Sequence, residues 1–330
     1  MDRRRARPRR LTLGLALAVA ATAAAAGPDP PLRAQRWLAP GSALVLARAP
    51  TECLAPPAEP DAAGSDAILA VEVGRAAFRT PVLLGGQAAR AGLSCESCHR
   101  SGRTNPQFLF PGVSGPPGTA DVTTSLFSSH RGDGIFDPRP IPDLSGAKTA
   151  LKVAQGLPAR APEPFIHGLV VEEFDGHEPP PVVLAGLAAY VRALNPAACP
   201  PGADAPLSAR LYLEDARRAA RAGLALVAKG DRESAELMMA AARARLGLIH
   251  ERYAGASLAP ERERLRQSDR ELAAIADAIR QGRPAEAPLR RWLAGSQALE
   301  RALAKGEPAS LFNPARLAAA TASPLPPVRR

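Results

Sequence analysis

The chain has 330 residues, of which 46% are hydrophobic and only 4% aromatic, and its formal net charge is +10. A chain of this length and apolar content is long enough for two modest domains, each with its own core. Half of the net charge comes from the arginine-rich residues 1–10, so the rest of the chain carries an ordinary charge and nucleic acid is not an expected partner. Long runs of alternating β-branched residues are missing, which argues against a large sheet.

Residues 1–26 have the three-part layout of a secretory signal peptide. Basic residues fill Arg3–Arg10, an apolar stretch follows over Leu11–Ala26, and small residues precede Gly27. We expect cleavage near Ala26, which would leave a periplasmic protein with no transmembrane span. The alternative is a membrane anchor, although the apolar stretch is shorter than the roughly 20 residues that a spanning helix needs. Residues 27–64 are rich in proline and alanine without periodicity, and they are predicted to be a linker.

The first predicted helix covers residues 66–78. Ser65 or Asp66 would cap its N-terminus, and Ile68, Val71 and Phe78 recur at helical spacing. Gly74 lies one turn before Phe78, where a glycine would let another helix approach closely. Residues 79–93 contain Pro81 and a pair of glycines and are predicted to be a loop.

The motif Cys95-Glu-Ser-Cys98-His99 has the spacing at which c-type haem is attached to proteins. Two thiols can add to the two vinyl groups of one porphyrin edge, and the histidine that follows can bind iron from the proximal side. We therefore predict one covalent haem c, held by Cys95 and Cys98, with iron on His99. The alternatives are a redox C-x-x-C pair or half of a zinc site. The chain has no second C-x-x-C or H-x-x-x-H to complete a zinc site, and no βαβ pattern surrounds the pair.

The segment after the motif is rich in proline and glycine as far as Asp143. This composition forbids long helices and suits a backbone wrapped around a flat ligand. A helix is predicted over Pro181–Leu194, with Pro196 just beyond its end. Helix, haem motif, looped wrap and closing helix together form the layout of a class I cytochrome c domain, which we place at residues 65–200.

Four stretches within residues 65–197 resemble one haem domain of the bacterial di-haem cytochrome c peroxidase family. They are Gly74–Phe78, Leu93–His99, Pro164–Gly168 and Leu187–Leu194. The family carries two C-x-x-C-H sites, whereas this chain has one. The resemblance implies a cytochrome c-like fold and peroxidase-like activity as an alternative function.

The resemblance also implies a pairing for the two cysteines outside the haem motif. Cys53 precedes the opening helix and Cys199 follows the closing helix. In the fold of this family the terminal helices cross, which would bring the two cysteines together, and an exported protein can keep a disulfide. Two free thiols or an intermolecular link are the alternatives.

Residues 205–306 change in character, being rich in Ala, Leu, Arg and Glu. Four helices are predicted, at 207–229, 232–253, 260–281 and 288–305, with Gly230 and Gly282 as C-terminal stops. The predicted fold class is therefore all-α, with a cytochrome c-like haem domain followed by an antiparallel helical bundle. Residues 307–330 are predicted to be a flexible tail.

The sequence offers several candidates for the residue that would bind iron on the side opposite His99. Apart from Met1, the methionines are Met238 and Met239, which lie on a predicted bundle helix and are expected in its core. His130 is the preferred candidate, because it lies in a flexible loop that could fold over the ring. His167, His177 and an open position are the alternatives.

These features lead to three functional hypotheses. The first is a periplasmic monohaem cytochrome that transfers electrons to or from a redox partner protein, with the bundle as a docking element. The second is a peroxidase-like enzyme, in which an open iron position would need a nearby acid–base group such as Glu172 or Glu173. The third is a haem-based sensor.

Overall fold

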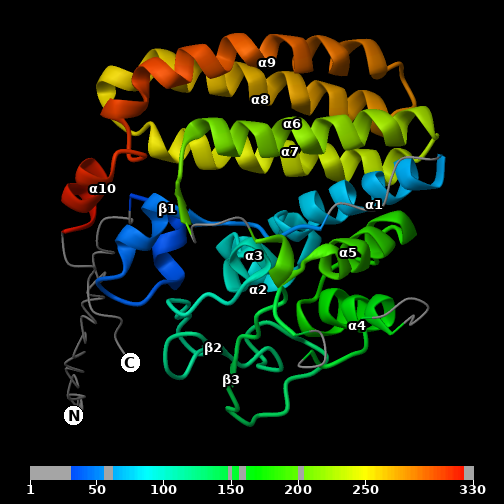
Figure 1. The fold of residues 1–330 in the computed structure, drawn as a ribbon, viewed down its shortest axis with the longest axis vertical. Helices are drawn as coiled ribbons and strands as arrows, with labels where there is room; N and C mark the ends of the chain where they lie inside the picture. Colours follow the sequence, from blue (N-terminus) through cyan, green and yellow to red (C-terminus); the bar gives the residue numbers. More distant parts are fainter. Residues whose placement is uncertain (1–30, 56–61, 148–150, 156–160, 200–203, 323–330) are drawn as a thin grey trace, which may run out of the picture. The chain divides into compact units, whose positions relative to one another are not determined.

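The computed structural model describes residues 31–55, 62–147, 151–155, 161–199 and 204–322. The predicted signal peptide lies outside these residues, as do parts of the predicted linker, of the predicted haem domain and of the predicted tail. The described chain is mostly helical and its only strands form two small two-stranded sheets, which confirms the all-α class. Figure 1 shows the arrangement.

The longer elements have the following bounds. The α-helices are α1 (Ala62–Phe78), α2 (Gly86–Ala91), α3 (Cys95–Cys98), α4 (Pro162–Gly168), α5 (Pro181–Ala193), α6 (Ala209–Ala228), α7 (Arg232–Arg252), α8 (Ala259–Arg280), α9 (Glu286–Gly306) and α10 (Pro314–Thr321). The antiparallel strand pairs are β1 (Arg48–Pro50) with β4 (Asp204–Pro206), and β2 (Thr119–Ala120) with β3 (Arg139–Pro140).

Short 3-10 helices occupy several connections, and one π-helical turn follows α4. The 3-10 helices are η1 (Arg33–Trp37), η2 (Ala43–Ala47), η3 (Pro81–Leu83), η4 (Arg100–Gly102), η7 (Pro196–Ala198), η8 (Ala256–Leu258) and η9 (Glu307–Ala309), and the π-helical turn is η6 (Leu169–Glu173). Residues 79–93, predicted as a loop, therefore hold η3 and α2.

Helix α1 begins at Ala62, so Ser65 and Asp66 lie inside it and the prediction that one of them caps it was wrong. The glycine of α1 does allow a close helix crossing. A Cβ atom placed on Gly74 would lie 1.8 Å from the carbonyl oxygen of Gly186 in α5. The two backbones are thus in direct contact, and glycine is required on the α1 side of the crossing.

The four C-terminal helices, α6–α9, match the predicted ranges to within two residues. Helix α6 ends before Gly230 (φ 79°) and α8 before Gly282 (φ 67°), which are left-handed conformations that favour glycine. In order along the chain each of these helices packs on the next, and α6 also packs on α9. Met238 and Met239 are fully buried, as predicted.

The described residues of the predicted linker and of the predicted tail form short ordered elements that pack against the rest of the chain. Strand β1 pairs with β4, and Leu32, Ala47 and Leu317 of α10 form a small apolar cluster. Phe312 is buried as well. Their composition hid this order, because scattered apolar residues in a proline-rich or alanine-rich segment show no periodicity until other elements cover them.

Two apolar clusters fill the interior. The larger cluster is continuous from α1 and α5 into the C-terminal helices, and Val73, Leu187, Leu213 and Met238 belong to it. Helix α1 contacts α5, α6 and α7, so the predicted haem domain and the C-terminal helices share this core (Figure 1). The second cluster surrounds the chain near α3; it consists of Trp37, Leu84, Ala88, Leu93, Phe108, Val113, Phe127 and Ile141.

Candidate functional site

The predicted haem-attachment motif forms the single turn α3. The hydroxyl of Ser97 accepts a hydrogen bond from the backbone N–H of Ser94 (3.1 Å), and the N–H of His99 donates to the carbonyl oxygen of Cys95 (2.8 Å). These bonds fix the turn and hold Cys95, Cys98 and His99 as neighbours on it. Cys95 and Cys98 are free thiols, each half-buried.

Both thiols are held in their neutral form. Burial raises the pKa of Cys95 and of Cys98 to about 12. Reactive redox cysteines and metal-bound thiolates have the opposite property, a pKa lowered by nearby positive charge or by the metal. The environment of this pair therefore disfavours the redox C-x-x-C alternative.

The imidazole of His99 is oriented by a backbone carbonyl. Its Nδ1 lies 3.0 Å from the carbonyl oxygen of Pro142, so Nδ1 carries the proton and donates it. His99 is half-buried, and desolvation lowers the pKa of its ring to about 4. The ring is thus neutral near pH 7, with the lone pair of Nε2 free to bind a metal, which is the arrangement that metal-binding histidines use.

Apolar side chains flank the motif on two sides. Cys95 packs against the larger apolar cluster and Cys98 against the second. The ring of Phe78 lies with its centroid 6.4 Å from that of His99. Two adjacent thiols, an oriented imidazole and apolar walls make up the donor set and surroundings that a covalently bound porphyrin needs, so these residues fit haem c.

The other candidate histidines lie in three different settings. The His130 side chain is 63% exposed, and its Nε2 is 3.9 Å from Oδ1 of Asp175. His167 on α4 places Nε2 2.7 Å from a carboxylate oxygen of Glu178, and His177 is exposed. Across the described residues, no group of three or more His, Cys, Asp or Glu side chains is arranged to hold a metal ion.

A buried carboxylate lies beside the loop of His130. The hydroxyl of Ser128 donates to the carbonyl oxygen of Glu172 (2.6 Å) and accepts the N–H of His130 (3.1 Å). Glu173, the next residue, is 6% exposed, and its Oε2 has no hydrogen-bond partner in the described structure. Burial raises the pKa of Glu173, against the opposing charge of Arg131 at 3.7 Å.

Cys53 and Cys199 are joined in a disulfide, with their Cα atoms 4.4 Å apart. Backbone hydrogen bonds align the two segments on either side of it. The N–H of Asn195 donates to Cys53 O, and the N–H of Ala55 donates to Ala193 O, both at 2.8 Å. The bond joins the segment before α1 to the segment after α5 and so closes residues 53–199 into one covalent loop.

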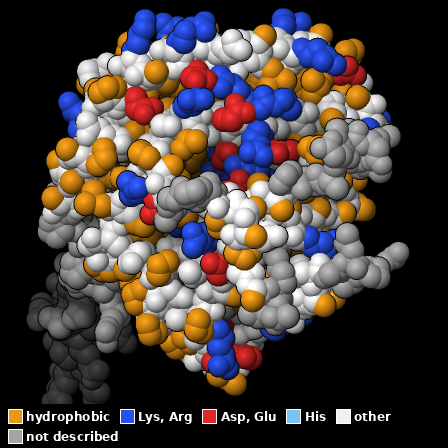
Figure 2. All heavy atoms as spheres, in the orientation of Figure 1, with side chains coloured by type: hydrophobic (Ala, Val, Ile, Leu, Met, Phe, Trp, Pro, Cys, Tyr) orange, Lys and Arg blue, Asp and Glu red, His pale blue; other side chains and the backbone are white. Residues whose placement is uncertain are grey.

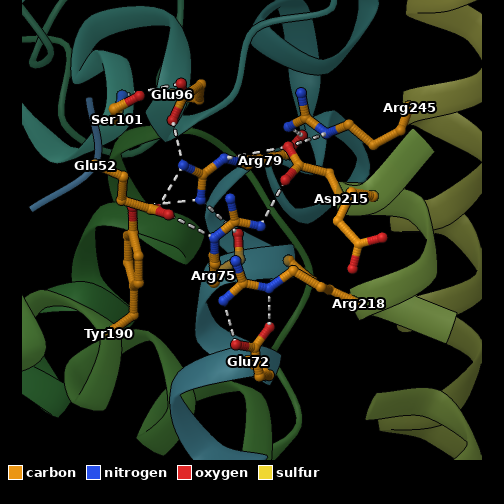
Figure 3. A network of polar contacts seen from close by, with 12 residues as sticks. Glu52, Glu72, Arg75, Arg79, Glu96, Ser101, Tyr190, Asp215, Arg218 and Arg245 are labelled. Carbon is orange, nitrogen blue, oxygen red and sulfur yellow. Dashed lines mark hydrogen bonds and ion pairs between the residues drawn. The ribbon is translucent and has the colours of Figure 1, made fainter. Parts of the chain in front are cut away.

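A buried network of charged side chains adjoins the predicted haem motif, and the sequence did not predict it (Figure 3). Glu52 accepts from Arg75 of α1 and from Arg79, which directly follows α1. Arg79 also faces Glu96, one of the two residues between the cysteines, at 3.5 Å. Arg75 continues the network to Asp215 of α6 at 2.7 Å. The available signal was a pair of arginines four residues apart at the end of the predicted helix.

Comparison with known protein families, with curated proteins and with solved structures found no match. Within the described ranges, no helix combines the length and the apolar character that crossing a membrane requires.

Proposed function

We propose that this chain is a periplasmic monohaem c-type cytochrome that transfers electrons to or from a partner protein. Haem c would be attached to Cys95 and Cys98, with iron on His99. The observation that carries the proposal is the α3 turn, where two neutral thiols adjoin an imidazole whose Nδ1 donates to Pro142 and whose Nε2 is left for a metal. The finer fold assignment, a class I cytochrome c-like domain joined to an antiparallel helical bundle, belongs to the same proposal.

The protein would control the cofactor through its own residues. When bound, haem c supplies an iron centre that gains and loses one electron. Pro142 O fixes the orientation of the His99 ring and raises its basicity as a ligand. Phe78 and the apolar side chains of the two clusters would keep water away from a bound haem, and the loop of His130 would supply the sixth ligand.

The disulfide and the predicted signal peptide support an extracytoplasmic location. Disulfides persist in oxidising compartments, and c-type haem is attached to exported chains. We therefore propose the periplasm as the location and another redox protein as the partner.

The decisive experiment is mass spectrometry of the full chain expressed in a host that matures c-type cytochromes. We expect the mass to rise by one haem, with the adduct on the peptide containing Cys95 and Cys98. The double variant Cys95→Ala/Cys98→Ala should lose the adduct, because no thiol remains to form the thioethers. An unmodified wild-type chain from a competent host would overturn the proposal.

Absorption and EPR spectra of the same material test the sixth ligand. Low-spin iron that does not react with cyanide or carbon monoxide is expected for an electron-transfer protein with two filled axial positions. His130→Ala should convert the iron to high spin, and His177→Ala serves as the matched control. An unchanged spectrum in His130→Ala would remove His130 as the ligand.

A second candidate function is a peroxidase-like enzyme, and Glu173 is the observation that favours it. Its carboxyl is buried, its Oε2 has no hydrogen-bond partner in the described structure, and its pKa is raised. Such a group is suited to carry a proton between the two oxygens of a peroxide. Glu173 follows Glu172, whose carbonyl oxygen is bonded to the loop of His130.

Glu173→Gln separates the two functions. In a peroxidase, we expect the rate of reaction with peroxide to fall by about 10²-fold or more, since the proton carrier is lost. Because the raised pKa means that the fold favours the neutral carboxyl, Glu173 costs stability as pH rises through that pKa. Glu173→Gln should therefore raise the melting temperature at pH 7 and leave it unchanged at pH 4.

The matched control is Glu172→Gln. Glu172 pairs with Arg131 at the surface, where ion pairs contribute little, and this variant should change neither quantity. A peroxide reaction that is unaffected by Glu173→Gln would rule out Glu173 as the proton carrier.

A further inference from the structure

A cleft of ≈ 750 Å³ adjoins the predicted haem motif, and Glu96 and Ser97 of the motif line it. Its other walls come from η1 and β1, from the end of α1 and from α6 and α7. Figure 2 shows charged side chains of both signs gathered in a hollow beneath the C-terminal helices. The volume is within the range of sites that hold small organic molecules.

The charges that line this cleft are unequal. Among the described residues, seven arginines line it, against the four carboxylates Glu52, Glu96, Asp215 and Asp269. Several of the arginines are paired; Arg243, for example, is held by Asp269 at 2.8 Å. The excess positive charge of the cleft therefore lies on those arginines that no carboxylate pairs closely.

Arg100 is the least compensated of these arginines. It makes no ion pair with any described carboxylate, and only its Nη2 donates, to the carbonyl oxygens of Val45 (3.1 Å) and Arg48 (2.7 Å). Its Nε and Nη1 have no acceptor within the described chain. A guanidinium with two donors left over is able to bind a carboxylate.

Arg245 of α7 is the second under-compensated guanidinium. Its nearest carboxylate, Asp215, is 3.9 Å away, and its Nη2 donates to a backbone carbonyl, that of Arg79. Arg100 and Arg245 line the cleft together with Glu96 and Tyr212. The guanidinium of Arg245 lies over the Tyr212 ring, 5.8 Å from its centroid.

Two of the side chains that line the cleft are apolar and exposed to solvent. Val82 is 61% exposed and Leu211 of α6 is 41% exposed, and both line the cleft. A purely ionic ligand would leave these side chains in water. A ligand with an apolar body would cover them and gain about 25 cal/mol for each Å² of apolar surface buried.

We propose that this cleft binds a small carboxylic acid with an apolar body. The carboxylate would lie against Arg100 and Arg245, and the apolar body would cover Val82 and Leu211. Because Glu96 and Ser97 stand between the haem cysteines in the sequence, the ligand would touch the motif from its polar side. The site uses no atom of the proposed haem and does not rest on it.

The test is isothermal titration of the full chain with sodium octanoate at low ionic strength, with octanamide as the uncharged comparison and inorganic phosphate as the anion without an apolar body. One octanoate site is expected. Octanamide and phosphate should each bind at least about tenfold more weakly, since each lacks one of the two contacts.

Variants locate the site. Arg100→Gln should weaken octanoate by about tenfold or more, and Leu211→Ser should weaken octanoate but leave phosphate unchanged. Arg139→Gln is the matched control, because Arg139 is 77% exposed and, among the described side chains, pairs only with Asp137. Leu211 is a surface side chain, so Leu211→Ser keeps the test valid if Arg100→Gln does not fold.

Three results would overturn the proposal: no saturable octanoate binding, octanamide binding as tightly as octanoate, or wild-type affinity in both cleft variants. The same titration on Cys95→Ala/Cys98→Ala should give wild-type affinity. A failure of haem attachment thus leaves the cleft testable, and a failure of octanoate binding leaves the haem proposal untouched.

Discussion

Glu52→Gln should destabilise the protein by about 3 kcal/mol, because it removes the central anion of the buried charge network. One carboxylate oxygen of Glu52 accepts from Arg79 (2.7 Å) and from the hydroxyl of Tyr190 (2.6 Å), and the other accepts from Arg75 (2.7 Å). The arginine side chains are only 5% and 11% exposed. Without Glu52 they would remain buried with too little negative charge around them.

The effect should depend on pH in a defined direction. Glu52 has its pKa lowered from 4.5, because the charges of Arg79 and Arg75 outweigh the opposing effect of burial. A carboxyl whose pKa is lowered by folding stabilises the fold above its unfolded pKa, and this contribution is lost as pH falls below it. The difference between wild type and Glu52→Gln should therefore be full at pH 7 and shrink below about pH 4.5.

Urea unfolding at pH 7 and at pH 3.5 measures both effects. Glu286→Gln is the control. Within the described structure, Glu286 forms only a surface pair with Arg290 at 3.7 Å, so this substitution should cost less than about 1 kcal/mol. Equal stability of Glu52→Gln and Glu286→Gln at pH 7 would show that the network contributes no net stability.

Gly74→Ala should destabilise the protein at least as much as Glu52→Gln. The added methyl group would lie 1.8 Å from the carbonyl oxygen of Gly186, and a backbone atom cannot move aside as a side chain can. The two helices would have to separate and open the core around Val73 and Leu187, at a cost of about 3 kcal/mol or more. Loss of soluble protein on Gly74→Ala would also agree with this prediction.

Gly247→Ala is the matched control. Gly247 lies in α7, and a Cβ atom placed on it meets no atom within 4 Å. Alanine there should be neutral or should stabilise the helix by up to about 1 kcal/mol. If Gly74→Ala were as stable as Gly247→Ala, the backbones of α1 and α5 could not be in direct contact at Gly74.

The Cys53–Cys199 bond and this crossing are two separate links. The disulfide joins the segment before α1 to the segment after α5, and the crossing joins α1 to α5 through contact of the two backbones. Glu52 adjoins Cys53 and binds Arg75 of α1, Arg79 just after α1 and Tyr190 of α5. Arg79 in turn faces Glu96 of the predicted haem motif.

Local patterns were enough to predict much of this protein. The Cys95–Cys98–His99 spacing, the helix at 181–194 and the glycine stops at 230 and 282 depend on residues a few positions apart, so they can be read directly from the chain. The tertiary structure alone decided which distant groups meet: Pro142 O with His99, Glu52 with Tyr190, and Asp215 with Arg75. It also decided that residues expected as linker and tail contribute to the packing. Periodicity identifies the buried face of a helix but not the partner of that face, because the partner depends on how elements from distant parts of the chain pack together.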